Sequence, residues 1–541
     1  MATTYSITTP TVVEDPSFDY HPDISISVIA DDSDDTALAP GPVIHEKSPP
    51  AVALYLQSIL VTFMQNILPP LKLYLFTAYL HGSTEHIAQL TALENVAWTA
   101  RLLFAALSDA LPVLGYRRKF WLSLGWFITL VSVAVMAFTP LQSPFCDPKI
   151  YSTCWNPKAN TTQAAYDLTA PSRVAFYRAP TFFATLGVVM VAANVDGLMV
   201  EYAQREPLAT RGQIQILTYS VTGSGGLLAR FFNQFFLNGK RYGGNYDFSA
   251  GPNVAYYLSV AMALAGLAVV VFMVHDTKRA LSKQESMDAS PEHSNQWLAG
   301  LWSLVQNRAV YQLLAFRLLF NLFSTITGAP IVSWVTNLDM GWINITPRML
   351  FVPATIQFGR FGLHWNWRRS LGTATAANLA LMALATFLVV YDASRNAYVY
   401  SVLLVLTGIP VAVSNLVLGF VMVEMASVGY EAVVAGLWAT IKDLNVPIAA
   451  QVRTHLMDAF PATLALKNDS VTQSHVGYTH VVAFGVQLVG LVWLVLLPAQ
   501  KTPVAMLKQH GGARIGGACV VLGYVALLAF CLQQNIHSYV Q

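Results

Sequence analysis

The chain has 541 residues, of which 55% are hydrophobic and only 11% are charged, and its formal net charge is +2. This composition excludes an ordinary soluble domain, in which about a quarter of the residues are charged. No basic patch or nucleic-acid-binding motif is present, so nucleic-acid partners are not expected.

Residues 1–50 are expected to be an acidic tail. Asp and Glu recur through the first 49 residues, and Lys47 is the one basic side chain among them. Low hydrophobicity with excess charge predicts a disordered segment, and the loop charges described below place it in the cytoplasm. The tail has no basic stretch followed by an apolar core, so a cleavable signal peptide is not predicted. A sorting or regulatory role is the alternative to a plain solvated tail.

Apolar runs fill the rest of the chain, and each is long enough to span a bilayer, which takes about 20 residues. The first six helices are expected at 52–80, 87–108, 119–140, 173–200, 211–238 and 253–275. The second six are expected at 308–337, 344–363, 370–391, 396–424, 431–458 and 478–498. We therefore predict an all-α polytopic membrane protein.

The spacing of these runs predicts two bundles of six helices. They cover residues 51–275 and 301–500 and are joined by a polar cytoplasmic linker at 276–300. Residues 501–541 form a tail that contains a further apolar run, 515–532, which predicts an extra C-terminal helix.

Loop charge predicts the orientation. Lys and Arg are more frequent in the loops that are cytoplasmic if the N-terminus is cytoplasmic. Asn160 and Asn468 then lie outside as candidate glycosylation sites. Cys146 and Cys154 also lie outside, where a disulfide between them is one alternative and two free thiols the other. The membrane is either the plasma membrane or an endomembrane.

Glycine and proline interrupt the expected helices at matching positions in the two halves. The pairs are Pro69–Pro70 with Gly328–Pro330, Pro180 with Pro410, and Gly223–Gly226 with Asn445–Pro447. Matched interruptions in membrane helices point to a central cavity that satisfies the freed backbone groups. Ordinary helix packing is the alternative.

Two loops carry paired arginines where a helix re-enters the membrane. The residues concerned are Asp109, Gly115, Arg117 and Arg118 in the first half, and Arg368 and Arg369 in the second. Asp109 would hold these cations, or a neighbouring helix C-terminus, while the inner gate is shut. A simple orientation signal is the alternative.

The segment Ser108–Lys119, with Gly125-Trp126 after it, resembles the folate–biopterin transporter family, a branch of the major facilitator architecture. Looser matches are Asp196–Glu201 with Arg205-Glu206 and Arg211–Gln213, and Glu424 with Gly429–Ala432 and Lys442–Asn445. The chain departs from the family at Arg101-Leu102, where the family often has Lys-Pro. We expect the charge to be kept there and the kink to be lost.

The resemblance implies a major-facilitator-type bundle of six plus six helices. It further implies a secondary active transporter with alternating access for a small organic anion of the folate or pterin type. A small-molecule substrate, a proton as co-substrate, the lipid bilayer as surroundings and a functional monomer are expected, with no cofactor. Glu201 and Arg211 would belong to the gating residues.

Ionisable side chains at bilayer depth are costly, so each is a candidate for binding or coupling. With their polar neighbours, the candidates are Gln65, Asn66, Lys72, Glu94, Arg101, Arg178, Asp196, Arg230, Arg317, Lys442, Asp443 and Asn445. For Arg178 and Arg317 the alternative is a side chain that reaches out to the interface. Substrate carboxylates would pair with Arg or Lys, and a flat ring would stack on Trp98 or Trp334.

Glu94 and Arg101 lie seven residues apart and hence on nearly one helix face. Glu94 or Asp196 would bind a proton and couple transport to a gradient. A fixed Glu–Arg pair that holds the helix to its neighbour is the alternative.

Three other classes of function compete. A membrane enzyme would need clustered His, Asp or Cys, and neither catalytic nor metal-ligand spacing is seen. A transporter-derived sensor would keep the two-halves plan, and a carrier for an amino acid, sugar or drug-like compound would keep the transport function. Substrate flux separates these alternatives.

Overall fold

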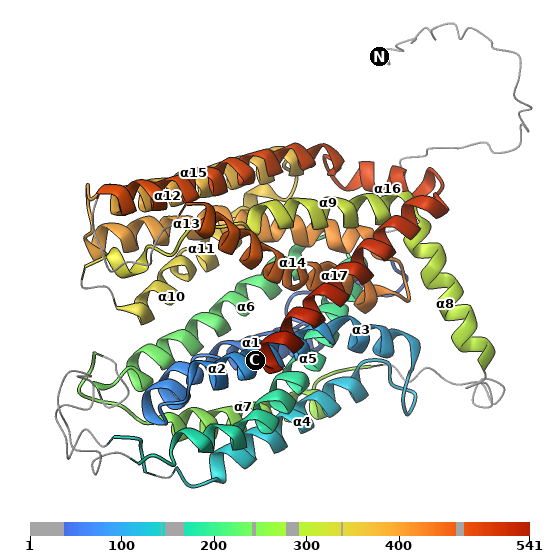
Figure 1. Ribbon diagram of the computed structural model, residues 1–541. Coiled ribbons are helices and arrows are strands. Elements are labelled where there is room, and N and C mark those ends of the chain that lie inside the picture. Colours follow the sequence, from blue (N-terminus) through green and yellow to red (C-terminus); the bar gives the residue numbers. More distant parts are fainter. Residues whose placement is uncertain are drawn as a thin grey trace, which may run out of the picture. The chain divides into compact units, whose positions relative to one another are not determined.

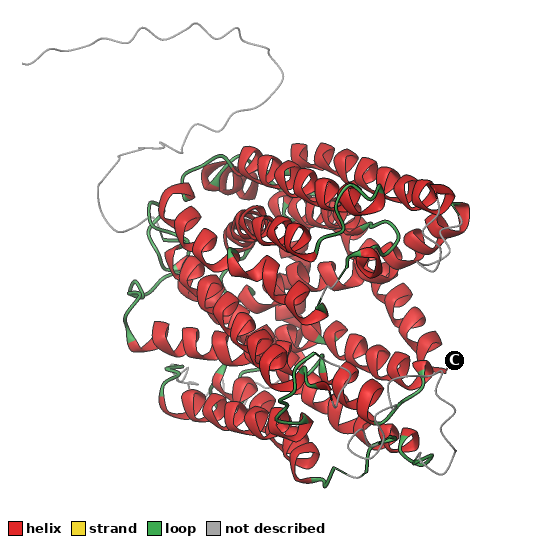
Figure 2. Ribbon diagram, turned by 90° about the vertical axis from the view of Figure 1, so that its left-hand side faces the viewer, coloured by secondary structure: helices red, strands yellow, loops and turns green. Residues whose placement is uncertain are grey.

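The computed structural model describes residues 37–141, 143–146, 167–240, 245–276, 291–336, 339–460 and 470–540. Within these ranges the secondary structure is helical, and no β-strand forms beyond isolated bridges (Figure 2). Residues 37–541 form a single unit. Most of the predicted tail lies outside the described residues.

The first half of the chain forms seven α-helices and two π-helical segments in the described ranges. They are α1 (Pro49–Ile67), a π-helix (Lys72–Tyr79), α2 (Thr84–Thr99), α3 (Arg101–Ala110), α4 (Lys119–Phe138), α5 (Val174–Gln204), α6 (Gln213–Phe232), a π-helix (Asn233–Leu237) and α7 (Pro252–Phe272).

The second half continues with shorter and longer helices. They are α8 (Pro291–Gln306), α9 (Arg308–Thr325), α10 (Met340–Met349), α11 (Phe351–Gly362), α12 (Trp367–Val390), α13 (Ala397–Met425), α14 (Glu431–Ala459), α15 (Ser470–Gly490), α16 (Lys501–Gln509) and α17 (Arg514–Val540).

The all-α polytopic fold is confirmed. Among the described residues, nine helices are long and apolar enough to cross a membrane. This is four fewer than the expected thirteen. Two of the missing spans are interrupted, since α2 and α3 meet at Ala100 and α10 and α11 meet at Leu350, and the other two, α6 and α9, are less apolar than the nine. The expected extra helix is present as α17, whose 27 residues reach the length of a span.

The interruption between α2 and α3 corrects one expectation. We expected a helix without a kink because Leu102 replaces the family's proline, yet the helix breaks at Ala100. The Thr99 hydroxyl donates to the carbonyl oxygen of Val96 at 2.6 Å, a local bond that competes with helical pairing. The break places Arg101 at the first position of α3.

Other expected interruptions behave differently from one another. The chain leaves the α-helix at Pro69–Pro70, and α9 ends at Thr325, before Gly328–Pro330. In contrast, Pro180, Pro410 and Pro447 lie inside continuous helices, as does the glycine run of α6. Those four expected breaks were wrong. A membrane helix tolerates the one N–H that a proline lacks when its neighbours satisfy the freed groups, whereas the glycines of α6 keep their N–H groups and remove no helical hydrogen bond.

The helices of the two halves lie in separate parts of the unit. Figure 1 shows α1–α7 together in one part and α9, α12, α13 and α15 in the other, with α14 and α17 between them. Contacts across the halves join α14 to α3 and α5, and α6 to α11. A space between the halves is therefore bounded by helices from both.

Close packing of α4 against α5 depends on glycine. A Cβ on Gly187 would lie 2.4 Å from the Thr129 Oγ1 atom and 2.6 Å from the Gly125 carbonyl oxygen. Small residues permit such close approach of membrane helices.

We expect Gly187→Ala to lower the free energy of unfolding by about 1–3 kcal/mol, because the added methyl group overpacks this contact. Gly485→Ala is the matched control, since a Cβ there meets no atom within 4 Å. Thermal unfolding of the purified protein in detergent measures both. Equal stability of the two variants would contradict the packing argument.

Candidate functional site

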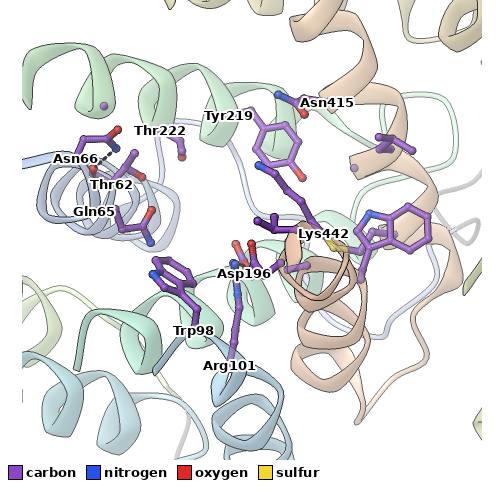
Figure 3. A pocket seen from close by; sticks show the side chains of 18 of the residues that line it. Thr62, Gln65, Asn66, Trp98, Arg101, Asp196, Tyr219, Thr222, Asn415 and Lys442 are labelled. Carbon is purple, nitrogen blue, oxygen red and sulfur yellow. Dashed lines mark hydrogen bonds and ion pairs between the residues drawn. The ribbon is translucent and has the colours of Figure 1, made fainter. Parts of the chain in front are cut away.

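A cavity of about 570 Å³ lies between the two halves. Its volume falls in the range of small-molecule sites. Its walls come from α1, α2, α3, α5 and α6 of the first half, from α9, α10, α11, α13 and α14 of the second half, and from α17. Figure 3 shows polar side chains of α1 facing Tyr219, Asn415 and Lys442 across this space.

Arg101 and Asp196 form an ion pair in the cavity wall. The guanidinium of Arg101 also lies 5.8 Å from the ring centre of Trp98, within range of a cation–π interaction. Figure 3 shows the three side chains together. Arg101, Asp196 and Trp98 thus combine a cation, an acid and an aromatic face at one place.

Arg230 lies near the end of α6 and joins α1 to the second half. Its Nε and Nη2 atoms donate to Asn66 Oδ1 at 3.0 and 2.8 Å. Its Nη1 atom donates to the carbonyl oxygen of Asn344 in α10 at 2.5 Å. Asn66 and Arg230 both line the cavity.

Three further cations reach the cavity from the second half: Arg317, Arg348 and Lys442. Arg317 lies in the middle of α9, 5.3 Å from the Trp438 ring centre. The alternative for Arg317, a side chain that reaches out to the membrane interface, is therefore wrong. Within the described part of the chain, the Lys442 ammonium and the Asp443 carboxylate make no ion pair or hydrogen bond, so they remain available to a ligand.

The cavity is strongly cationic as a whole. Its charged lining consists of five cations and two acids, namely Arg101, Arg230, Arg317, Arg348, Lys442, Asp196 and Asp443. A concave site with such an excess of positive charge attracts anions.

Four predicted site residues do not line the cavity. Lys72 and Glu94 form an ion pair of 2.5 Å that joins the π-helix 72–79 to α2. Glu94 therefore does not share a site with Arg101, although the two lie on nearly one face, because the helix break at Ala100 separates them. Asn445 is buried and donates to the Leu318 carbonyl at 3.3 Å, which is a helix-packing contact.

Arg178 lies near the start of α5, outside the cavity lining. Trp334 was also a wrong choice for the aromatic wall. Its ring lies 5.3 Å from the Arg395 guanidinium, in a cluster of its own.

Sequence reasoning missed several lining residues. Arg348 could have been predicted, because it lies within an expected membrane span, where a charged side chain is costly unless it has a function. Nothing in the sequence around Tyr219 and Trp438 distinguishes them from aromatic residues that only pack between helices. Cys531 and Asn535 lie on α17, outside the two expected bundles.

A largely buried ion cluster lies on one side of the unit, which we call the latch side. Arg117 pairs with Asp109 at 2.8 Å and with Glu431 at 2.6 Å, and Arg118 pairs with Asp109 at 2.6 Å. The backbone N–H of Val433 donates to Asp109 Oδ2 at 2.8 Å. We call Asp109, Arg117, Arg118 and Glu431 the latch cluster.

The latch cluster joins the first half to the start of α14. Of the two partners expected for Asp109, the structure has the arginines and not a helix C-terminus. The carboxylate also meets the N-terminus of α14, whose exposed N–H groups favour negative charge. The side chain of Asp109 is fully buried, and those of Arg118 and Glu431 are nearly so. The loop turns sharply at Gly115, which has a φ of 78° that favours glycine.

A second inter-half contact lies on the latch side. Arg211 pairs with Glu424 at 3.0 Å, and both side chains are buried. The amide of Gln204 donates to the carbonyl oxygens of Val423 and Ala426 at 3.3 and 3.0 Å. Arg211 thus bridges the halves, as its place among the expected gating residues suggested.

Three other expected gating residues do not join the halves. Glu201 pairs with Arg205 at 2.6 Å at the end of α5. Arg368 donates to the carbonyl oxygens of Leu497 and Val495 in its own half. The backbone N–H of Arg369 donates to the Asn366 side chain, and the Arg369 side chain is exposed. The second arginine pair is therefore not a copy of the latch.

Glu206, in the loop between α5 and α6, is buried next to the latch-side contacts. Its carboxylate accepts N–H bonds from Gly212 at 2.6 Å and from Ile214 at 2.9 Å. Burial raises the pKa of Glu206 to about 7, although these bonds and Lys501 act in the opposite direction.

The folded protein therefore holds this proton more tightly than the unfolded chain does. The stabilisation is complete below the ordinary glutamate pKa and is lost as pH rises through about 7. We expect Glu206→Gln to flatten the dependence of thermal stability on pH between 5 and 7.5, by up to about 3 kcal/mol. The exposed Glu85→Gln is the control, and parallel curves for the wild type and Glu206→Gln would contradict this origin.

Several predicted features lie partly or wholly beyond the described residues. Cys146 is disulfide-bonded, and its predicted partner Cys154 is outside the described ranges. Asn160 and Asn468 are outside them as well. Among the described residues, no group of three or more His, Cys, Asp or Glu side chains is placed to bind a metal.

Helices long enough to span a bilayer, arranged around a polar cavity, define an integral multi-pass membrane protein with a solute-sized site. The model of the BT1 family, that of the folate–biopterin transporters, matches residues 67–147. This match confirms the predicted resemblance over the part of the chain that holds Arg101 and three residues of the latch cluster, and it implies a transporter. Among curated proteins, no match to the chain was found.

Proposed function

We propose that this transporter carries a small organic anion by alternating access. The observation that supports this proposal most directly is the cationic cavity between the two halves. Its five Arg and Lys side chains outnumber its two acids, and Lys442 has no ion pair within the described residues. Carboxylate groups of a solute pair well with such cations in a water-poor site.

A folate or pterin is the solute class that this lining favours. Trp98, Tyr219 and Trp438 supply aromatic faces for a flat ring. The amides of Gln65 and Asn415 supply hydrogen-bonding groups for the ring edge. The BT1 family match supports the same class.

Proton coupling would act through Asp196. A solute carboxylate competes with Asp196 for Arg101, and the displaced acid then takes up a proton from water. The proton accompanies the solute and is released when Asp196 pairs with Arg101 again. Glu94 suits this role less well, because it pairs with Lys72 outside the cavity.

The latch cluster would close the cytoplasmic side of the cavity, and the N-terminus would also be cytoplasmic. Residues 51–275 and 301–500 would be the two moving bundles of a major-facilitator-type monomer. Glu431 begins α14, and Trp438 lines the cavity seven residues later. Seven residues correspond to about 10 Å along a helix, so the latch lies one or two turns from the solute.

Uptake into vesicles containing the purified protein tests this proposal. We expect saturable uptake of labelled folate or biopterin, and none of labelled glucose. Lys442→Gln should reduce the uptake at least about tenfold, whereas Arg173→Gln, in a loop pair with Asp167, should not. Binding of folate without uptake would instead favour a transporter-derived sensor. Uptake of glucose in place of folate would overturn the substrate class.

A further inference from the structure

Helix α17 presents one buried stripe to the unit. Its buried residues are Gly517, Tyr524, Cys531 and Asn535, at spacings that place them along one face. The rest of the helix is largely exposed, as expected for a surface in contact with lipid. The stripe packs against α2, α8, α9 and α14, which belong to different parts of the chain.

The first turns of α17 are fixed to the junction of α8 and α9. The N–H of Ala513 donates to the Gln306 carbonyl at 3.0 Å, and the N–H of Arg308 donates to the Gly511 carbonyl at 3.3 Å. A Cβ on Gly517 would lie 3.1 Å from the Val305 carbonyl oxygen. This end of α17 is therefore attached to the second half.

The other end of α17 crosses to the first half. Asn95 Nδ2 of α2 donates to Asn535 Oδ1 at 3.1 Å, and Asn535 Nδ2 donates to the Cys531 carbonyl at 2.8 Å. Figure 1 shows α17 running from α16 towards α2. If the two halves move relative to each other, the contact between α2 and α17 has to break or slide.

Asn95 and Asn535 lie between two cavities. Both line the central cavity, and both line a second pocket of about 380 Å³ between α2 and α17. The other polar residues of this pocket are Thr84, Thr91 and Ser538. Its lining carries no charged side chain, in contrast to the central cavity.

We propose that the pocket between α2 and α17 is a second solute position on the route to the central cavity, and that the Asn95–Asn535 hydrogen bond is the gate between them. This inference rests on the proposed function. The hydroxyl and amide groups of the pocket suit the uncharged, hydrogen-bonding ring of the solute. The cations of the central cavity suit its acidic part.

Thiol labelling tests the gate without any flux measurement. In a Cys519→Ala background, Cys531 reports on the central cavity, since Cys519 is the other free thiol of the described residues. A small anionic methanethiosulfonate is the probe. We expect Asn95→Ala to raise the modification rate of Cys531 roughly threefold to tenfold, as loss of one hydrogen bond between membrane helices allows.

Asn396→Ala is the matched control, because it removes an asparagine hydrogen bond at the start of α13 instead. Asn95→Ser serves as a milder variant if Asn95→Ala does not fold. An unchanged Cys531 rate in the Asn95 variant would overturn the gate.

Protection by folate tests the second position. With Ser538→Cys added in a Cys519→Ala, Cys531→Ala background, we expect folate to slow modification at residue 538, as it slows modification of Cys531 in the single variant. Protection of Cys531 but not of residue 538 would overturn the second position and leave the proposed function intact. Protection at neither residue would count against folate as the solute, while the effect of Asn95→Ala still decides on the gate.

Discussion

Arg101→Ala is expected to abolish uptake of the transported anion. Arg101 is both the partner of Asp196 and a cation of the cavity wall. Its removal deletes one attractive charge and leaves the Asp196 carboxylate unpaired where an anion should bind. Truncating one member of a buried, hydrogen-bonded charge pair costs about 2–5 kcal/mol. The Arg101–Asp196 pair is partly buried, so the lower end of this range applies and affinity should fall about 30-fold.

The measurement is the initial rate of uptake, with protein amount and thermal stability recorded for each variant. Arg173→Ala is the control, because its partner Asp167 lies in the same loop region away from the cavity. Arg101→Lys should retain part of the activity, since it keeps the charge. Unchanged uptake by a stable Arg101→Ala protein would remove this residue from the site.

Asp109→Asn is expected to slow turnover about tenfold to hundredfold while substrate affinity is largely kept. Asp109 is fully buried and neutralises Arg117 and Arg118 at the start of α14. Without its charge, the partly buried Arg117 and the buried Arg118 share Glu431 alone, and the latch-closed conformation loses stability. The cavity residues are untouched, so equilibrium binding should change little.

Uptake kinetics and equilibrium binding, measured on the same preparation, separate these two effects. Asp392→Asn is the control, because Asp392 is an acid whose partner Arg395 lies three residues away in the same loop. A large loss of affinity with normal exchange in Asp109→Asn would contradict the role of the latch cluster.

The sequence predicted the fold and the first latch loop well, because both depend on local patterns. Runs of apolar residues define the helices, and Asp109 with Arg117 and Arg118 form a compact motif whose charges must find partners. The partner Glu431 lies more than 300 residues away. Its pairing depends on how α14 packs against α3, which no local pattern specifies.

The site was predicted less completely, for two physical reasons. Because intramembrane charges are often functional, Lys72 and Glu94 were predicted as site residues, but they form an ion pair with each other outside the cavity. The position of a residue along a helix does not show how the helix is rotated about its axis in the fold. The sequence therefore cannot distinguish a charged residue that lines the cavity from one that pairs with a neighbouring helix. Asn535 was missed because the packing of α17 on α2 arises only in the tertiary structure.

Labelling of a cavity cysteine from each side of the membrane tests the central claim most directly. Thr222→Cys, in a background without Cys519 and Cys531, places a thiol in the cavity wall. With an impermeant reagent, we expect reaction from the side opposite the latch, and a clear rise of reaction from the latch side when Asp109→Asn is added. Reaction from neither side, or from one side only in both proteins, would contradict a cavity that opens to the two compartments in turn.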